Sequence, residues 1–275
     1  MDMITAHGLR MPKLGLGTFR MKDADCADAV RSALELGYRH IDTAEMYDNE
    51  EPVGQGIASS GVARGDIHLT TKVWWEHLAG DGIVRAAEAS LKRLGTDYVD
   101  LYLIHWPAPE MDLKQAIGAL MQVKEQGMAR AIGVSNFPSA LLRRAVEEVG
   151  APIACNQFES PVLLGQRQMA ETAQSVGAAV VAYAPLAQGR LAGNDALQAI
   201  AKTHGATPAQ VALKWLLDQD GVAAIPKAGR RESQQANLDA LRIELDDADR
   251  ATIAGLAKDQ RFVNPGFAPA WDPVG

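Results

Sequence analysis

The 275-residue sequence has few cysteines, few aromatic residues and no long uncharged apolar run. The two cysteines, Cys26 and Cys155, fall in a helical pattern and a strand pattern, so we expect buried reduced thiols and no disulfide. The longest apolar run, 178–187, is too short for a transmembrane helix and contains Pro185. The N-terminus lacks a charged-then-apolar signal pattern, so a cytoplasmic protein is predicted.

Basic residues are also in the minority. Lysine and arginine number 27 against 34 aspartates and glutamates, which gives a formal net charge of −7. A broad nucleic-acid or anionic-membrane surface would need a basic face, so neither partner is expected. The six histidines show no H-x-H or H-E-x-x-H pairing, so no metal site is expected.

What the sequence does contain is a regular alternation of short apolar runs with amphipathic helical stretches. Eight runs have the composition of buried strands: 14–18, 39–43, 68–73, 99–105, 131–136, 153–159, 179–184 and 221–226. This order predicts an α/β fold, a (β/α)₈ barrel with residues 1–275 in one domain, in place of an open doubly wound sheet. We also expect an N-terminal hairpin and an extra C-terminal helix that begins at Asp246.

Helix signals separate these strands. Cys26, Ala29, Val30 and Ala33 recur at helical spacing before Gly37, which is typical of an amphipathic helix with a glycine stop. Thr207-Pro208-Ala209-Gln210 is a capping box with proline at the first helical position. After Arg261 the chain is rich in proline and glycine, and we expect an irregular tail.

In a barrel of this kind, the active site forms at the carboxyl ends of the strands. Acids, bases, amides and aromatic side chains follow the predicted strands there. They are Thr18, Phe19, Asp42, Tyr47, Lys72, Trp74, His105, Trp106, Ser135, Asn136, Gln157, Tyr183 and Lys227.

Two motifs match other enzyme classes only in part. Gly15-Leu16-Gly17 resembles the start of a dinucleotide fingerprint, but Arg20 stands where its third glycine should be. Gly133-Val134-Ser135-Asn136-Phe137 has a phenylalanine in place of the closing glycine of a nucleophile elbow. Neither a Rossmann fold nor a serine hydrolase is predicted.

The motifs together resemble those of the aldo-keto reductases, in order over nearly the whole chain. The matching stretches are Met11-Pro12-Lys13-Leu14-Gly15-Leu16-Gly17-Thr18, the segment around Asp42 and Tyr47, Lys72, Leu103-Ile104-His105-Trp106-Pro107, Gly133-Val134-Ser135-Asn136-Phe137 and Ile225-Pro226-Lys227. Thr70-Thr71-Lys72-Val73-Trp74 and the ending 266–272 are most similar to bacterial 2,5-diketo-gluconate and methylglyoxal reductases. The resemblance implies an NADPH-dependent carbonyl reductase.

The resemblance assigns a catalytic tetrad to Asp42, Tyr47, Lys72 and His105. A carbonyl that receives hydride develops negative charge on oxygen and needs a proton donor and a polarising partner. Tyr47 would be the acid, with its pKa lowered by Lys72, and Asp42 would hold the Lys72 ammonium. His105 would hydrogen-bond the carbonyl oxygen. Taken singly, each residue could instead be structural.

For the cofactor, the resemblance places the nicotinamide carboxamide on Ser135, Asn136 and Gln157, and the nicotinamide ring on Tyr183. Amides supply paired donors and acceptors, and an aromatic face orients the ring. The remaining cofactor-binding residues expected are Thr18, Asp42, Leu186, Lys227, Arg230, Arg231 and Asn237.

The basic turn Pro226-Lys227-Ala228-Gly229-Arg230-Arg231 suits an adenosine 2′-phosphate, although it could also be a solvated turn. Many aldo-keto reductases continue Lys-Ser here and carry an arginine four residues before the asparagine. This chain has Ala228 and Ser233 at those positions and keeps Asn237. We therefore expect Arg230, together with Arg231, to replace the usual anchor, with NADPH preferred and NADH as a possible second cofactor.

The substrate mouth is expected to be lined by Phe19, Trp74 and Trp106, with Met46 and Trp271 beside them. The short tail predicts an open pocket for small aldehydes, α-oxoaldehydes and keto-sugar acids, and the resemblance suggests a monomer. Two alternatives remain open at this point. A Schiff-base barrel aldolase could use Lys72, and a non-catalytic nucleotide-sensing barrel could share the fold.

Overall fold

Eight parallel strands lie side by side in the order in which they follow one another along the chain. The computed structural model describes residues 2–274. The strands are β3 (Leu16–Gly17), β4 (His40–Asp42), β5 (His68–Val73), β6 (Val99–Ile104), β7 (Ala129–Ser135), β8 (Ile153–Glu159), β9 (Ala179–Tyr183) and β10 (Val222–Ala224). Sequential parallel order, with a helical crossover between neighbours, is the topology of a barrel.

The first and last strands close the sheet. Gly15 N–H donates to Ala224 O at 2.9 Å, and Gly17 N–H donates to Pro226 O at 3.2 Å. A Cβ atom at Gly17 would lie 2.6 Å from Ile225 O, so only glycine permits this approach. The predicted (β/α)₈ barrel is therefore confirmed.

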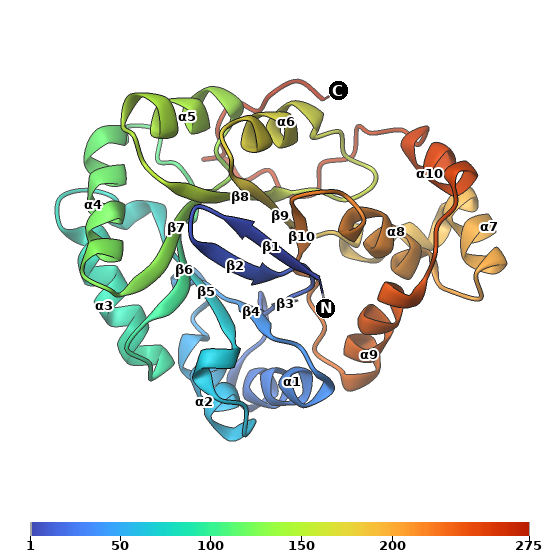
Figure 1. Ribbon diagram of the computed structural model, residues 1–275, viewed down its shortest axis with the longest axis horizontal. Coiled ribbons are helices and arrows are strands. Elements are labelled where there is room, and N and C mark those ends of the chain that lie inside the picture. Colours follow the sequence, from blue (N-terminus) through green and yellow to red (C-terminus); the bar gives the residue numbers. More distant parts are fainter. Residues whose placement is uncertain (1, 275) are drawn as a thin grey trace.

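Helices surround the sheet as a ring (Figure 1). They are α1 (Asp23–Leu36), α2 (Glu50–Ser59), α3 (Gly82–Leu94), α4 (Leu113–Glu125), α5 (Ser139–Arg143), α6 (Arg167–Ser175), α7 (Asp195–Thr203), α8 (Pro208–Leu217), α9 (Arg231–Asp239) and α10 (Asp247–Ala254). A π-helical stretch, Arg144–Glu148, continues α5. Helix α10 is the expected extra helix, and its capping box at Asp246 is formed.

Helix α7 is the element that the sequence interpretation missed. At the N-terminus of α7, the Asn194 side chain accepts a hydrogen bond from Leu197 N–H. The buried stripe of this helix is formed by Leu197, Ile200 and Ala201. Both signals were present in the sequence, so this helix could have been predicted.

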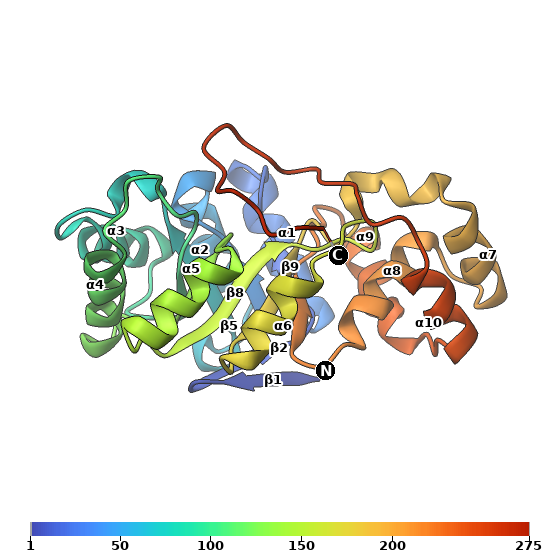
Figure 2. The ribbon, with the colours of Figure 1, turned by 90° about the horizontal axis from the view of Figure 1, so that it is seen from above.

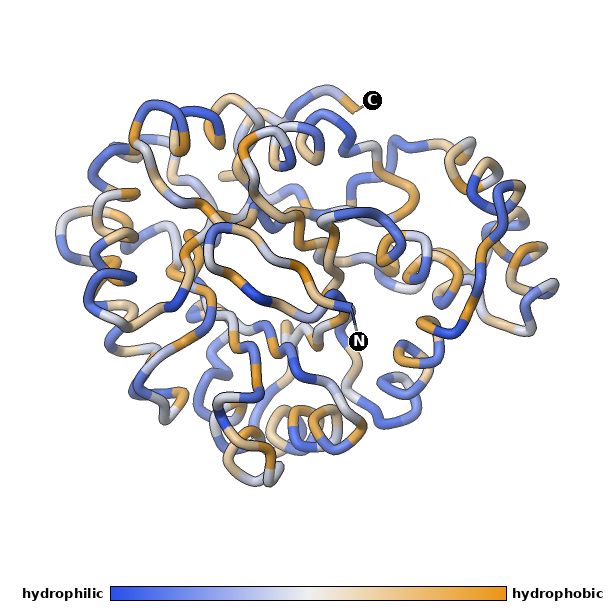
Figure 3. Tube along the Cα trace, viewed as in Figure 1, coloured by the Kyte–Doolittle hydropathy of each residue, from blue (hydrophilic) through white to orange (hydrophobic). Residues whose placement is uncertain are grey.

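The helices present one apolar side to the sheet and a polar side to solvent (Figure 3). In α1 the predicted stripe from Cys26 to Ala33 is buried. The helix ends where Gly37 adopts a left-handed φ of 106° and its N–H bonds to the last turn. Burial of a stripe of this kind contributes roughly 1.5–3 kcal/mol for each large aliphatic side chain.

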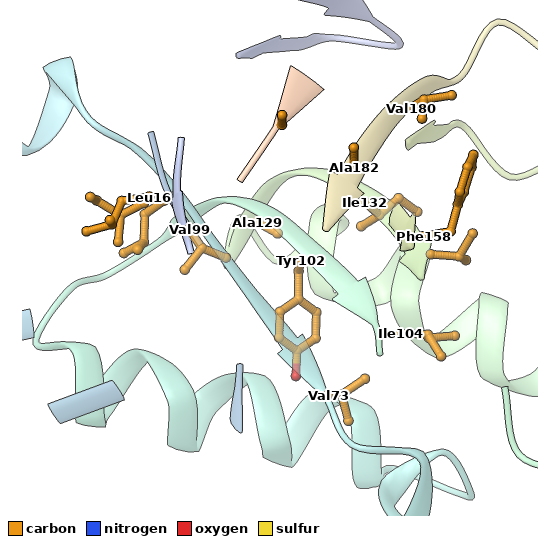
Figure 4. Close-up of a cluster of buried hydrophobic side chains, with 14 of the residues drawn as sticks. Leu16, Val73, Val99, Tyr102, Ile104, Ala129, Ile132, Phe158, Val180 and Ala182 are labelled. Atoms are coloured by element: carbon orange, nitrogen blue, oxygen red, sulfur yellow. The ribbon is translucent and has the colours of Figure 1, made fainter. Parts of the chain in front are cut away.

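Side chains of each strand alternate between two apolar layers. Tyr102 and Ile104 point outward into the layer between sheet and helices (Figure 4), whereas Leu101 and Leu103 fill the barrel interior. Cys155 lies in this interior and Cys26 in the outer layer, both as free buried thiols, as expected.

The two ends of the barrel are covered by opposite ends of the chain. The predicted N-terminal hairpin, β1 (Met3–Ala6) with β2 (Leu9–Pro12), closes one end, and the C-terminal tail crosses the other (Figure 2). Leu9 and Met11 of the hairpin are buried against the barrel interior. The carboxyl ends of the strands therefore remain the open end, which is covered only by loops and the tail.

Within residues 2–274, no helix has the length and apolar character needed to cross a bilayer. The same residues contain no group of three or more His, Cys, Asp or Glu side chains placed to hold a metal ion.

Candidate active site

Three neighbouring strands bring the predicted acid, lysine and histidine together. Asp42 ends β4, Lys72 lies near the end of β5, and His105 directly follows β6. Tyr47 reaches the same place from the 3₁₀ turn Glu45–Tyr47 that follows β4. Because adjacent parallel strands end at the same edge, residues far apart in sequence become neighbours.

A buried ion pair joins Lys72 and Asp42. Lys72 Nζ donates to Asp42 Oδ1 at 2.5 Å and to Thr43 O at 2.7 Å. Gln157 Nε2 donates to Asp42 Oδ2 at 2.8 Å, so both carboxylate oxygens have partners. Since both charged side chains are almost fully buried, this complete set of partners offsets part of their desolvation cost.

The Tyr47 ring lies between this ion pair and His105. Lys72 Nζ is 5.0 Å from the centroid of the Tyr47 ring, and the ring packs edge-on against His105 with centroids 5.5 Å apart. Lys22 Nζ donates to Tyr47 O at 2.9 Å and to Asp48 O at 3.3 Å, which holds the turn from outside. The Tyr47 ring is therefore held by its packing against His105, and the backbone of its turn is held by Lys22.

Burial is the largest influence on the pKa values of Tyr47, His105 and Lys72. It raises the pKa of Tyr47 well above its usual value, and the negative charge of Asp42 adds to the effect. Burial also lowers the pKa of His105 well below its usual value, with a further contribution from the Lys72 charge. Burial lowers the pKa of Lys72 too, while Asp42 opposes this.

The expected lowering of the Tyr47 pKa is therefore wrong as a net effect. Desolvation of the phenol and the negative charge of Asp42 together outweigh the stabilising effect of the nearby Lys72 ammonium. At neutral pH the phenol is protonated and the imidazole is neutral, so both can donate a hydrogen bond.

The predicted carboxamide-binding residues form one connected network. Ser135 Oγ donates to Gln157 O at 2.8 Å, and Asn136 Nδ2 donates to Ser135 Oγ and His105 O, each at 3.0 Å. Tyr183 Oη donates to Asn136 Oδ1 at 2.8 Å. Much of the polar capacity of Asn136 is thus used within the protein, which fixes its orientation beside His105.

A cavity of about 640 Å³ opens above the tetrad. Many of the predicted site residues line it: Thr18, Phe19, Asp42, Met46, Tyr47, His105, Trp106, Asn136, Tyr183, Leu186 and Lys227. Lys72, Ser135 and Gln157 do not line it and lie beneath its floor. The Lys72 amine is thus sequestered in an ion pair, which argues against a Schiff-base aldolase.

A second, solvent-open groove of about 980 Å³ continues from this cavity. Arg20 and Lys227 line both spaces and mark the junction. Arg230 and Arg231, at the start of α9, line the groove, but Asn237 lies outside both spaces, beside Tyr38.

The tail forms an aromatic cover that the sequence interpretation missed. Phe267 packs against Trp74, Trp75 and Trp106, each at 5.5 Å between ring centroids. Trp271 packs on Trp106 at 5.9 Å. Of the predicted substrate residues, Trp74 and Trp271 therefore support the cavity wall from behind and do not line it.

Two acids, the buried Glu159 and the half-buried Asp272, hold this tail in place. Glu159, at the end of β8, accepts hydrogen bonds from Phe262 N–H at 2.8 Å and Val263 N–H at 3.1 Å. Asp272 accepts from Ser139 N–H and Ser139 Oγ at the start of α5. Val263, which follows the first attachment, lines the cavity.

Apart from Leu186, the loop after β9 is the other part of the cavity wall that was missed. Ala184, Ala187 and Gln188 adopt left-handed φ angles between 46° and 52° there. Gln188 and the N-terminal residues of α8, Thr207 and Pro208, face the same space. The capping box at Thr207 had predicted the helix correctly, but nothing in the sequence showed that this helix would border a ligand site.

Residues 13–258 match the family model described as the aldo/keto reductase family. The chain belongs to the aldo/keto reductase family. Its members use nicotinamide cofactors, so this aldo-keto reductase is an oxidoreductase that acts on carbonyl compounds.

Individual relatives agree with this membership. A methylglyoxal reductase, DkgB of Salmonella typhi, is 44% identical over 268 residues, which cover 96% of this chain and 100% of the relative. An aldo-keto reductase of Mycolicibacterium smegmatis is 42% identical over 93% of both chains. The crystal structure of a protein provisionally named 2,5-diketo-D-gluconic acid reductase B superposes with a TM-score of 0.96 at 38% identity, covering 99% of this chain and 98% of the other.

Proposed function

We propose that this aldo-keto reductase is an NADPH-dependent reductase of small aldehydes, α-oxoaldehydes or keto-sugar acids, with Tyr47 as the proton donor. The observation that carries the proposal is that two adjoining spaces, the cavity above Tyr47 and His105 and the groove lined by Arg230 and Arg231, share Arg20 and Lys227. A catalytic acid at one end and exposed cations at the other suit a phosphorylated dinucleotide.

The residues of the cavity are compatible with a nicotinamide. Tyr183 offers an aromatic ring on the cavity wall, held by its bond to Asn136, and Asn136 lies next to the carbonyl of His105. Ser135 and Gln157 would support the carboxamide site from below. A bound nicotinamide supplies the hydride for the reduction.

The chain itself supplies the proton and its electrostatic setting. A substrate carbonyl oxygen between Tyr47 and His105 would accept hydrogen bonds from a neutral phenol and a neutral imidazole. As negative charge develops on that oxygen, the Tyr47 proton moves to it and the nearby Lys72 ammonium stabilises the phenolate that forms. Asp42 keeps Lys72 in place throughout.

The mouth of the cavity favours small substrates. Phe19 and Met46 are exposed at its rim, and Trp106 forms its inner wall. The methylglyoxal reductase name of the Salmonella relative supports α-oxoaldehydes as the first substrates to assay. That the protein is cytoplasmic, monomeric and a single domain over residues 1–275 stays a prediction.

The proposal is tested by assaying a panel of carbonyl compounds with NADPH and with NADH. Turnover is measured as the loss of coenzyme absorbance. Methylglyoxal should be reduced, and Tyr47→Phe should lower kcat by about 10²–10⁴-fold because the acid is lost. Tyr98→Phe is the matched control, since Tyr98 lies outside the cavity against Arg64 and Arg130. Normal turnover by Tyr47→Phe would rule out the proton donor, and absence of turnover across the panel by the wild type would refute the function.

A further inference from the structure

The groove at the adenosine end contains acids among its cations. It is lined by the cations Arg20, Lys22, Arg31, Lys227, Arg230 and Arg231 and by the acids Asp25, Asp28 and Glu35, the last of which lies near the end of α1. A phosphate bound there would meet a negative charge as well as positive ones.

Glu35 lies between two arginines from different helices. Its Oε2 is 3.2 Å from Arg231 Nη1, and its Oε1 is 3.9 Å from Arg31 Nε. A carboxylate shared by two guanidiniums occupies the kind of position that a phosphate group takes at such a site. Arg31 also pairs with Asp28 at 2.8 Å, so Arg231 is the more dependent of the two on Glu35.

Arg231 has a second anchor that would remain without Glu35. Its Nη1 also donates to Ser32 Oγ at 3.2 Å. Ser32 is in turn held by the buried Gln234, which bonds to Ala29 O and Ala228 O. Loss of the Glu35 charge would therefore leave Arg231 beside the groove, with more of its donor capacity available.

Arg230 presents the contrasting case. Its side chain makes no hydrogen bond or ion pair with any residue between 2 and 274, and it is exposed at the start of α9. Of the two adjacent arginines, Arg230 is free to bind an anion, whereas Arg231 is already paired with the carboxylate of Glu35.

We propose that Glu35 is a determinant of coenzyme specificity, a built-in anion that competes with the 2′-phosphate for Arg231 and limits the preference for NADPH over NADH. This inference rests on the proposed binding of NADPH in the groove. If Glu35 has this role, helix α1 contributes to the choice of coenzyme together with the basic turn before α9.

Quenching of tryptophan fluorescence by NADP⁺ and NAD⁺ tests the role of Glu35. Glu35→Gln should lower the Kd for NADP⁺ by about three- to tenfold, because an exposed charge at this distance acts through a largely aqueous medium. The Kd for NAD⁺ should stay unchanged, and the gain should shrink at high salt. In an Arg231→Ala background, Glu35→Gln should have a clearly smaller effect.

The matched control is Glu51→Gln on α2, which makes the same change in net charge outside the groove, at a residue that accepts a hydrogen bond from Gln55. An equal gain in Glu51→Gln, or equal changes for both coenzymes, would show a general charge effect and overturn the inference. Selective NADP⁺ binding by the wild type with no change in Glu35→Gln would refute the inference alone. Failure of the wild type to bind either coenzyme would refute the proposed function and the inference with it.

Discussion

The cavity above Tyr47 and the groove beside Arg231, which we propose as the catalytic end and the adenosine end of a coenzyme site, hold their charges in opposite ways. At the catalytic end, Lys72 and Asp42 are buried, and both oxygens of Asp42 have a partner. At the adenosine end, Arg231 and Glu35 are about half exposed, and Arg230 is unpaired among the described residues. A buried pair tolerates no loss of a partner, whereas an exposed pair can be exchanged for a ligand at little cost.

This difference separates two properties of the enzyme. The catalytic end has a single low-energy arrangement and should determine the rate of the chemical step. The adenosine end has several nearly equivalent arrangements and should determine which coenzyme binds. Substitutions at the two ends should therefore change different kinetic constants.

The largest effect is expected from Lys72→Met. It would leave the Asp42 carboxylate buried without its cation, with a loss of about 3–5 kcal/mol in the free energy of unfolding. It should also lower kcat by at least about 10²-fold, because the phenolate of Tyr47 would lose its stabilising charge. Urea denaturation and steady-state kinetics measure both quantities.

Asp42→Asn combined with Lys72→Met provides the control for that variant. The double variant should recover part of the lost stability and none of the lost activity, because no buried charge remains unpaired. A folded Lys72→Met enzyme with kcat within tenfold of wild type would contradict the assignment of Lys72 to the chemical step.

A smaller effect is expected from Arg230→Ala combined with Arg231→Ala. The KM for NADPH should rise by about ten- to a hundredfold through the loss of charge-assisted bonds to the 2′-phosphate, and the KM for NADH and kcat should change little. Arg242→Ala is the control, since Arg242 pairs with Asp239 away from the groove. An unchanged preference for NADPH would show that these arginines do not replace the missing anchor.

The smallest effect is expected from pH. The pKa of His105 lies well below its usual value and that of Tyr47 well above it, so neither group changes its protonation between about pH 6 and 9. The plot of kcat against pH should therefore show no titration of Tyr47 or His105 in this range. The KM for NADPH should rise a few-fold as pH falls through about 6, because the 2′-phosphate gains a proton and loses charge.

NADH has no 2′-phosphate, and pH profiles measured with it provide the comparison. Its KM should not show the rise near pH 6. A titration of kcat near the ordinary pKa of histidine would contradict the neutral state of His105.

The fold was predictable because local and global signals agree in the strands. The expected ranges 68–73 and 153–159 coincide with β5 and β8, both buried on their two faces and bounded by clear turn residues. The meeting of Asp42, Tyr47, Lys72 and His105 at one rim was predictable for a related reason. In a barrel, a polar residue at the end of a buried strand has one rim to occupy, so the register of the strands places it.

Other parts of the site had no such signal. Phe267 lies in a segment without periodicity, and its position depends on Glu159 and Asp272 holding the tail at two distant points. Glu35 looks like any solvated acid on a helix until α9 brings Arg231 beside it. The pKa of Tyr47 was predicted in the wrong direction because the sequence shows a nearby cation but cannot show how strongly burial desolvates the phenol or how close the Asp42 charge lies.

The closure of the barrel has a consequence for how the protein is made. Gly15 and Gly17 bond to Ala224 and Pro226, so the sheet cannot close before the final strand has been synthesised. Phe267 packs onto Trp74, Trp75 and Trp106 later still, because it lies close to the end of the chain. Asp42, Tyr47, Lys72 and His105 are therefore synthesised well before the strand that closes the barrel and the tail that supports the cavity wall. A chain that ends before Phe267 should keep these four residues and lose this aromatic support, and with it control over what enters the cavity.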